Sequence, residues 1–302
     1  MKRIDHIGFL LGVCLLTACT EDIIMDVPEG KRVPVVEGAF SDEYKRHEVI
    51  LSYSSALYDT VGREMISNAE VFVVSGGDTI WYYEQEDNPG HYLTDSVAGR
   101  KNRWYHLEVT VEENSLYEWP LRMYSDAKMP NNAAGIDSIG LRPKLDENDI
   151  PLVDDAAAVC ICPYFQTLND ASIVYNVELY LNGRIFKNRP SKLFNLFPMQ
   201  GYAGYYFNGP EMLHNNVEIP VGIMNRSYLH EGAVVKVKLY SISKDYRYFL
   251  MGQKMAIGNN PAMGAFPAMY SNIFSNCDAI GWFNATSVIE GEGVYHESVF
   301  QD

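Results

Sequence analysis

The sequence AEVFVVSGGDTIWYY, residues 69–83, carries the strongest local structural signal in the chain. Two runs rich in β-branched and aromatic residues flank Ser-Gly-Gly-Asp at 75–78, a turn composition typical of a β-hairpin. Apolar and polar residues alternate again at 47–54 and at 104–111. Because side chains on a strand point to opposite faces in turn, these segments predict antiparallel strands with one buried face.

The composition favours the same fold class over the whole chain. The 302 residues include 21 Tyr, 13 Phe and 4 Trp, and aromatic residues are enriched in strands. Six or seven strands with short turns in residues 31–125 predict an immunoglobulin-like β-sandwich as the N-terminal domain. The strand candidates there are 32–40, 47–54, 69–74, 79–83, 90–93, 104–111 and 116–123.

A second domain, also β-rich, is expected at 136–302, after a crossing segment at 125–135. Ser243 is a good N-cap for a helix over 244–256, and Gly258 is a good terminator. The sequence therefore predicts a mainly β chain with one short helix near the C-terminus. The strand candidates of the second domain are 136–141, 157–168, 172–181, 217–223, 233–242 and 280–284.

The N-terminus has the pattern of a bacterial lipoprotein signal. Lys2 and Arg3 precede a short apolar run at 7–16, which is too short to span a bilayer as a helix. Leu-Thr-Ala-Cys at 16–19 then predicts cleavage after residue 18 and lipidation of Cys19. We expect a signal peptide at 1–18, a membrane anchor on Cys19 and a flexible tether at 19–30. The alternative is an ordinary secretory signal in which Cys19 is incidental.

Charge and cysteine content restrict the partners. With 24 basic and 39 acidic residues the net charge is −15, and without a basic cluster we expect no nucleic-acid partner. Beyond the anchor, the cysteines are Cys160, Cys162 and Cys277. Two of them are two positions apart on one predicted strand face. Buried thiols are the favoured interpretation, while a metal site and a disulfide to Cys277 are the alternatives.

No catalytic constellation is recognisable in the sequence. There is no phosphate-binding glycine loop, nucleophile elbow or His-Glu-x-x-His motif. The histidines lack metal-ligand spacing, and a lone histidine on a strand is more often a partly exposed side chain than a ligand. The acidic stretch from Asp146 to Asp155 could hold calcium, although it lacks the spacing of an EF-hand loop. We therefore expect no enzyme activity, no metal and no cofactor.

Two further patterns suggest surface functions. The aromatic stretch 194–207 is a candidate contact surface, with Tyr202, Tyr205 and Tyr206 as the candidate patch, because tyrosine offers contact area at low entropic cost. The alternative is that half of these rings belong to the core. Four Asp-Ser/Thr-aliphatic triplets resemble O-glycosylation acceptors of exported Bacteroidota proteins. Their acceptor residues are Thr60, Thr79, Ser96 and Ser138.

Several phrases in order along the mature chain resemble one family, the Bacteroidota outer-membrane lipoproteins grouped as domain of unknown function 4249. Besides the cysteine motif, they are 35–38 (VVEG), 66–71 (ISNAEV), 90–92 (GHY), 129–130 (MP), 136–139 (IDSI), 237–243 (VKLYSIS), 271–273 (SNI) and 281–283 (GWF). The chain differs from the family pattern at Trp282 and at 276–278, where small residues are more usual. The resemblance implies a transthyretin- or immunoglobulin-like N-terminal module and no established catalytic residue.

The resemblance also implies a location and a partner. Glu21 and Asp22, directly after Cys19, resemble the signal that exports Bacteroidota lipoproteins to the outer face of the outer membrane. Family members are often encoded beside TonB-dependent receptors, so the first hypothesis is a binding or accessory partner of such a transporter in nutrient uptake. A fimbrillin-like structural subunit, cleaved near Lys31-Arg32, is the alternative. A surface hydrolase is the remote one.

Overall fold

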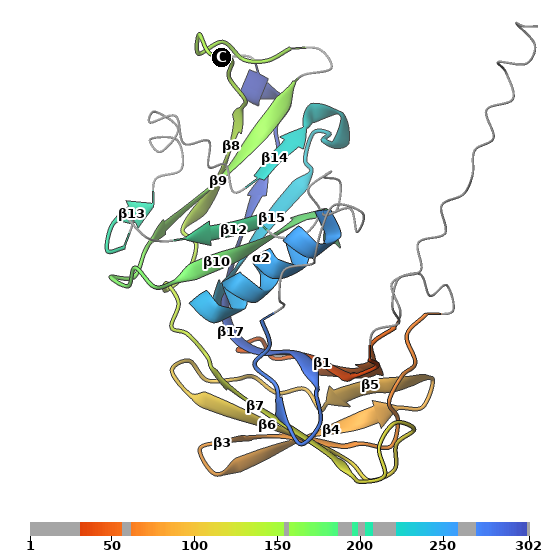
Figure 1. The fold of residues 1–302 in the computed structure, drawn as a ribbon. Helices are drawn as coiled ribbons and strands as arrows, with labels where there is room; N and C mark the ends of the chain where they lie inside the picture. Colours follow the sequence, from red (N-terminus) through yellow and green to blue (C-terminus); the bar gives the residue numbers. More distant parts are fainter. Residues whose placement is uncertain are drawn as a thin grey trace, which may run out of the picture. The chain divides into compact units, whose positions relative to one another are not determined.

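The computed structural model describes residues 31–55, 62–153, 157–186, 195–198, 203–207, 222–258 and 270–300. Residues from Arg32 onward form one compact unit. The expected fold class is confirmed: the protein is mainly β, with a large sheet and a helix near the C-terminus (Figure 1). The immunoglobulin- or transthyretin-like identity of the first module remains a prediction.

The hairpin at 69–83 forms as predicted and lies inside a long antiparallel array. Its strands are β3 and β4, and Gly76 and Gly77 take the positive φ angles, 61° and 92°, that such a tight turn requires. The N-terminal strands are β1 (Pro34–Ser41), β2 (Glu48–Tyr53), β3 (Glu70–Ser75), β4 (Asp78–Gln85), β5 (Asn88–Thr94), β6 (Trp104–Val111) and β7 (Leu121–Lys128).

The strand expected at 116–123 begins later, at Leu121. Asn114 explains the delay, because its side-chain oxygen accepts hydrogen bonds from the backbone N–H groups of Leu116 and Tyr117. This local bonding holds residues 114–117 in a turn. Pro120 then has no N–H to donate to a neighbouring strand, so pairing with β6 starts one residue later.

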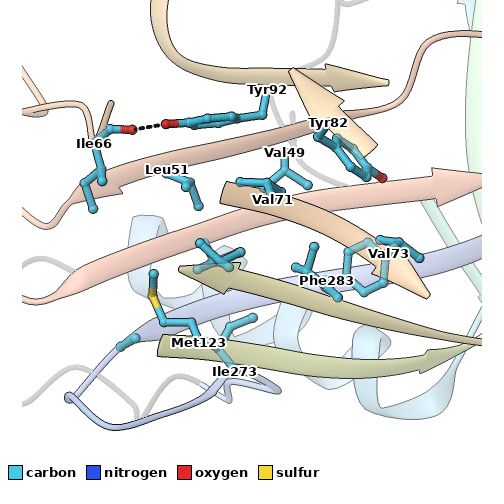
Figure 2. Close-up of a cluster of buried hydrophobic side chains, with 14 of the residues drawn as sticks. Val49, Leu51, Ile66, Val71, Val73, Tyr82, Tyr92, Met123, Ile273 and Phe283 are labelled. Atoms are coloured by element: carbon cyan, nitrogen blue, oxygen red, sulfur yellow. Dashed lines mark hydrogen bonds between the residues drawn. The ribbon is translucent and has the colours of Figure 1, made fainter. Parts of the chain in front are cut away.

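The inward side chains of these strands meet in one core. Val49 and Leu51 of β2, Val71 and Val73 of β3, and Met123 of β7 point into it (Figure 2). The hydroxyl of Tyr92 donates to the carbonyl of Ile66 inside this core, at 2.9 Å (Figure 2). Phe283 and Ile273 belong to the same cluster although they lie far away in the sequence. The N-terminal core therefore needs residues from the end of the chain.

Two sheets contain the N-terminal strands and all the other strands described here. The larger runs β11-β10-β15-β17-β1-β2-β5-β4-β3-β6-β7-β16, with β12 paired to β10, and the smaller runs β13-β9-β14 with β8 on β9. The C-terminal strands are β8 (Ser138–Pro143), β9 (Ala158–Gln166), β10 (Val174–Leu181), β11 (Arg184–Ile185), β12 (Asn195–Pro198), β13 (Tyr206–Phe207), β14 (Gly222–Asn225), β15 (Val234–Ile242), β16 (Phe274–Ser275) and β17 (Ile280–Val294). Short 3₁₀ turns η3 (Arg226–Tyr228) and η5 (Glu297–Phe300) and the helix α2 (Lys244–Gly258) complete the described elements.

Strand β17 connects the two halves of the large sheet. Its first half, from Ile280 to Thr286, pairs in parallel with β1, and its second half, from Ser287 to Val294, pairs antiparallel with β15. The sequence predicted a strand only over 280–284, whereas β17 continues to Val294. A Cβ on Gly291 or Gly293 would come within 3 Å of Ile136 or Ile139. These glycines therefore allow the start of β8 and the residues just before it to lie directly on β17.

The segment predicted to cross between domains is attached to β17 at the point where that strand changes partners. The buried amide of Asn132 donates 2.9 Å to the carbonyl of Ser287, whose hydroxyl donates in turn to the carbonyl of Pro130. Strands β16 and β17, from the predicted second domain, pair with β7 and β1 of the first. The large sheet thus contains strands from both predicted domains.

A second core lies between β8, β9 and β14 on one side and β10, β15 and β17 on the other. It contains Ile161, Phe165, Tyr175, Val177, Val235, Val237 and Ile289. Helix α2 packs against the opposite face of β10, β15 and β17, where Val174, Ile242 and Trp282 meet its apolar side chains. The order of layers is therefore sheet, sheet, helix.

Candidate functional site

Helix α2 begins where the sequence indicated. The hydroxyl of Ser243 accepts a hydrogen bond from the backbone N–H of Tyr246 at 3.1 Å, which is the N-cap interaction predicted for this residue. Tyr246, Phe249 and Leu250 lie on one face of the helix and pack on the sheet. The first two turns of α2 thereby bring two rings against Trp282 of β17.

The three rings form a compact aromatic cluster. The Phe249 and Trp282 centroids are 5.1 Å apart, those of Tyr246 and Trp282 5.7 Å, and those of Tyr246 and Phe249 5.9 Å. These separations lie in the range of favourable aromatic pairs. Burial, with a smaller contribution from Glu37, raises the pKa of the Tyr246 phenol to about 12. Tyr246 therefore stays neutral at physiological pH.

A pocket of about 480 Å³ opens beside this cluster. Its walls come from the aromatic cluster, from the polar face of β1 and β2, and from the turn that connects these two strands. The lining residues are Glu37, Gly38, Ala39, Lys45, Arg46, His47, Glu48, Ile50, Tyr246, Phe249 and Trp282. Aromatic walls with a few charged groups at the rim are typical of small-molecule binding sites, so we take this as the candidate site.

An ion-pair network fixes the β1–β2 turn at the edge of the pocket. Glu43 accepts 2.5 Å hydrogen bonds from both Lys45 and Lys238, and Lys238 also lies 3.4 Å from Glu290. Burial acts to raise the pKa of Glu43, but the two lysines outweigh it and hold the pKa below its ordinary value. Glu43 is therefore ionised at neutral pH, and its ion pair with Lys238 holds the turn against β15.

Asp42 adds a second connection at the same junction. Its carboxylate accepts a hydrogen bond from the backbone N–H of Val288 at 2.8 Å, just beyond the point where β17 leaves β1. Burial raises the pKa of Asp42, while this hydrogen bond and Lys101 oppose the rise. Together, Asp42 and Glu43 position the turn against both β17 and β15.

His47 lines the pocket, but both of its ring nitrogens take part in hydrogen bonds to the backbone. Its Nε2 lies 2.9 Å from the carbonyl of Val97, and its Nδ1 accepts from the backbone N–H of Ser41 at 3.4 Å. Its ring also packs 4.3 Å from Phe40, and burial lowers the pKa of the imidazole. His47 is buried and thus differs from the partly exposed histidine that is more usual on a strand. Since both nitrogens are engaged, His47 is not placed to act as a base.

The predicted surface sites lie in several places. Tyr205 and Tyr206 are exposed at the edge of the small sheet, and the Tyr206 hydroxyl donates to Asp137 at 2.7 Å. Thr79, Ser96 and Ser138 are also exposed, at or near strand ends. Tyr202, Thr60, Cys19, Glu21 and Asp22 lie outside the described residues. None of the described tyrosines and acceptor residues lines the pocket.

The cysteines and acids show no metal centre in the part of the chain described here. Cys160 and Cys162 are buried on β9, and Cys277 packs against the N-terminal core, so these three form no disulfide. Burial raises the pKa of the Cys162 thiol to about 11. The carboxylate of Asp146 accepts from the backbone N–H groups of Asn148 and Ile150, which accounts for it as a turn-forming residue. No group of three potential ligands occurs among the described side chains.

The sequence indicates some residues of this pocket, but not that they lie together. The predicted helix over 244–256 contains Tyr246 and Phe249, and Trp282 was noted as a departure from a family pattern. The acidic and basic lining residues on β1 and β2 carried no separate signal. Only the pairing of β17 with β1 brings Trp282 beside Glu37, its register partner.

Comparison with known protein families identifies the family of this chain. The family described as "Domain of unknown function (DUF4249)" matches residues 20–292. No curated protein matches the chain. In the described residues, no helix is both long and apolar enough to cross a membrane.

Proposed function

Because the chain belongs to the family described as "Domain of unknown function (DUF4249)", whose description assigns no reaction, we propose a function from its anchor motif and its pocket. The protein is an outer-membrane lipoprotein, held by lipid on Cys19 and facing the cell exterior. It acts as a binding or accessory partner of a TonB-dependent transporter in nutrient uptake. Its role is recognition rather than turnover.

The observation that carries this proposal is the sequence Leu-Thr-Ala-Cys at 16–19 behind a short apolar run. Several acyl chains on one cysteine are enough to hold a protein stably on a membrane. Glu21 and Asp22 support export to the outer leaflet. In this proposal the anchored protein acts by binding a ligand or a partner protein at the membrane surface.

The pocket supports a binding role. Its apolar wall is rigid, because Trp282 and Phe249 are almost fully buried and stack on each other. Glu37, Glu48 and Lys45 offer charged partners at the rim. The one histidine in the lining is engaged on both nitrogens. This combination suits orientation of a ligand more than acid–base chemistry.

The anchor is tested with Cys19→Ala and a matched control, Cys14→Ala, which changes a cysteine inside the expected signal. Wild type and the Cys14 variant should incorporate labelled fatty acid and sediment with outer membranes. The Cys19 variant should lose the label and appear in soluble fractions. Shaving intact cells with protease should degrade wild type, as expected for the outer face. Equal labelling of all three proteins would contradict the proposal.

The partner is tested by purifying the native lipoprotein from detergent-solubilised outer membranes. We expect a TonB-dependent receptor in stoichiometric amount, and reduced recovery of that receptor with Tyr205→Ala/Tyr206→Ala. Recovery of the lipoprotein alone contradicts the transporter role. Recovery as a ladder of covalent or detergent-resistant self-assemblies, with an N-terminus beginning after Arg32, would instead support the fimbrillin-like alternative.

A further inference from the structure

A row of aromatic side chains crosses the outer face of the N-terminal sheet. Strand register places Trp81 of β4 opposite Phe72 of β3, Phe72 opposite Glu108 of β6, and Glu108 opposite Tyr124 of β7. Tyr124 is in turn opposite Phe274 of β16. The row thus spans five adjacent strands, and at about 4.8 Å between strands it is about 19 Å long.

These rings are on the surface rather than in the core. Trp81, Tyr124 and Phe274 are 43%, 45% and 56% exposed. The residues on either side of them along the strands, such as Tyr82 and Met123, point into the core instead. Phe72 and Trp81 have centroids 4.9 Å apart, and Tyr124 and Phe274 stack at 5.3 Å with 18° between their planes. The rings form two supported pairs, one at each end of the row.

Charged acceptors lie between and beside the two pairs. Glu108 occupies the middle of the row, and Asp126 lies two residues beyond Tyr124 on the same face of β7. His106 connects the two acids, with Nδ1 2.8 Å from Asp126 and Nε2 3.4 Å from Glu108. Each carboxylate still offers acceptor positions to solvent, since about half of its side chain is exposed.

We propose that this row is a binding surface for a neutral oligosaccharide chain. A sugar ring presents C–H groups on its faces, which pack on aromatic rings, and hydroxyl groups at its edge, which donate to carboxylates. The two ring pairs would pack on the C–H faces, and the acids between and beside them would accept from the hydroxyl groups. The length of the row exceeds one sugar ring, so the ligand is a chain of several residues. This inference is independent of the proposed function.

A protein or a lipid surface fits the same face less well. The centre of a protein interface is depleted of charged residues, because an acid buried there without a partner is costly, yet Glu108 lies at the centre of this row. On the same face Arg122 and Lys128 alternate with Tyr124 and Asp126 along β7. With Glu70 and Glu108 on the neighbouring strands, the face has charges of both signs and not the basic cluster that an anionic membrane surface would attract. Hydroxyl donors satisfy these acids without burying an unpaired charge.

The test is affinity electrophoresis of the full mature lipoprotein in detergent, in gels containing xyloglucan, β-1,3-glucan, mannan or starch. We expect at least one polysaccharide to retard wild type. The variant Trp81→Ala/Tyr124→Ala/Phe274→Ala should lose that retardation, with Kd for an oligosaccharide of the same polymer raised at least tenfold in calorimetry. Tyr44→Ala/Tyr248→Ala, which removes two exposed rings elsewhere, is the matched control and should bind as wild type.

A second variant separates binding from folding. Glu108→Gln keeps the shape of the row and removes one charge, so it should weaken binding while leaving the melting temperature unchanged. The proposal is overturned if none of the four polymers retards wild type, or if the triple variant is retarded equally. It is also overturned if the triple variant loses only the co-purifying transporter, which would make the row a protein-docking surface. Fatty-acid labelling of Cys19 does not depend on any of these outcomes.

Discussion

Gly281 is the residue on which the joining of the two halves depends. Its φ is +128°, and a Cβ at this position would lie 1.9 Å from the carbonyl oxygen of Val36 on β1. Both the backbone conformation and the close approach therefore require glycine. The strand can pair with β1 from its first residues only because this position carries no side chain.

We predict that Gly281→Ala destabilises the protein by about 3 kcal/mol or more, since the new methyl group would push β17 away from β1. Gly77→Ala is the matched control. Gly77 also has a positive φ, +92°, but nothing lies within 4 Å of its added Cβ, so about 1 kcal/mol is expected. Urea denaturation of both variants measures the difference. Equal losses would show that conformation alone, not the contact with Val36, accounts for the glycine.

The ion pairs of Glu43 give the stability a defined pH dependence. The pKa of Glu43 is lowered in the folded protein, so the folded state binds its proton less readily than the unfolded chain. Its stabilisation is complete above the unfolded value near 4.5 and is lost as the pH falls through the lower folded pKa. Glu43→Gln should therefore cost about 2 kcal/mol at pH 7 and progressively less below pH 4.5.

Thermal melts between pH 3 and pH 8 measure this effect. Glu113→Gln changes an exposed acid in the loop after β6 and should follow wild type over the same range. If the Glu43 variant differs from wild type by a constant amount at every pH, the two lysines do not hold the carboxylate in its ionised form.

At the scale of elements, α2 was predicted well because its signals are local. Ser243 as N-cap and Gly258 as terminator need no distant partner to be recognised. The extent of β17 was missed because the evidence is non-local: Gly291 and Gly293 indicate a turn unless one knows that Ile136 and Ile139 lie against them. The start of β7 was misplaced for a different, local reason: the side chain of Asn114 bonds to the backbone of Leu116 and Tyr117 and delays the strand.

We predict that α2 is held to the sheet mainly by Phe249. Phe249→Ala should cost about 3 kcal/mol, because it removes a buried ring that stacks on Trp282 and leaves a cavity beneath the helix. Tyr248→Ala, one residue earlier and exposed, should change the free energy of unfolding by about 0.5 kcal/mol or less. Urea titrations followed by tryptophan fluorescence distinguish the two. A small loss for Phe249 would mean that other contacts hold the helix.

At the scale of the molecule, the two halves are expected to fold together. Phe283 and Ile273 fill the N-terminal core from the end of the chain, and β1 loses one neighbour if β17 is absent. A fragment of residues 31–128 should therefore lack a cooperative thermal transition, whereas residues 32–302 should show one. Circular dichroism and calorimetry on both fragments provide the measurement. Cooperative melting of the short fragment would establish residues 31–128 as an independent domain.

The sequence by itself determined the fold class, the hairpin at 69–83, the helix near the C-terminus, the family resemblance and the expected anchor on Cys19. Each of these depends on a local pattern: alternation, turn composition, a cap or a short motif. Only the tertiary structure decided that β17 joins both halves, that Trp282 meets Tyr246 and Phe249 beside Glu37, and that four aromatic residues from different strands form one row. Those features depend on register between distant segments, and register is set by packing rather than by local preference.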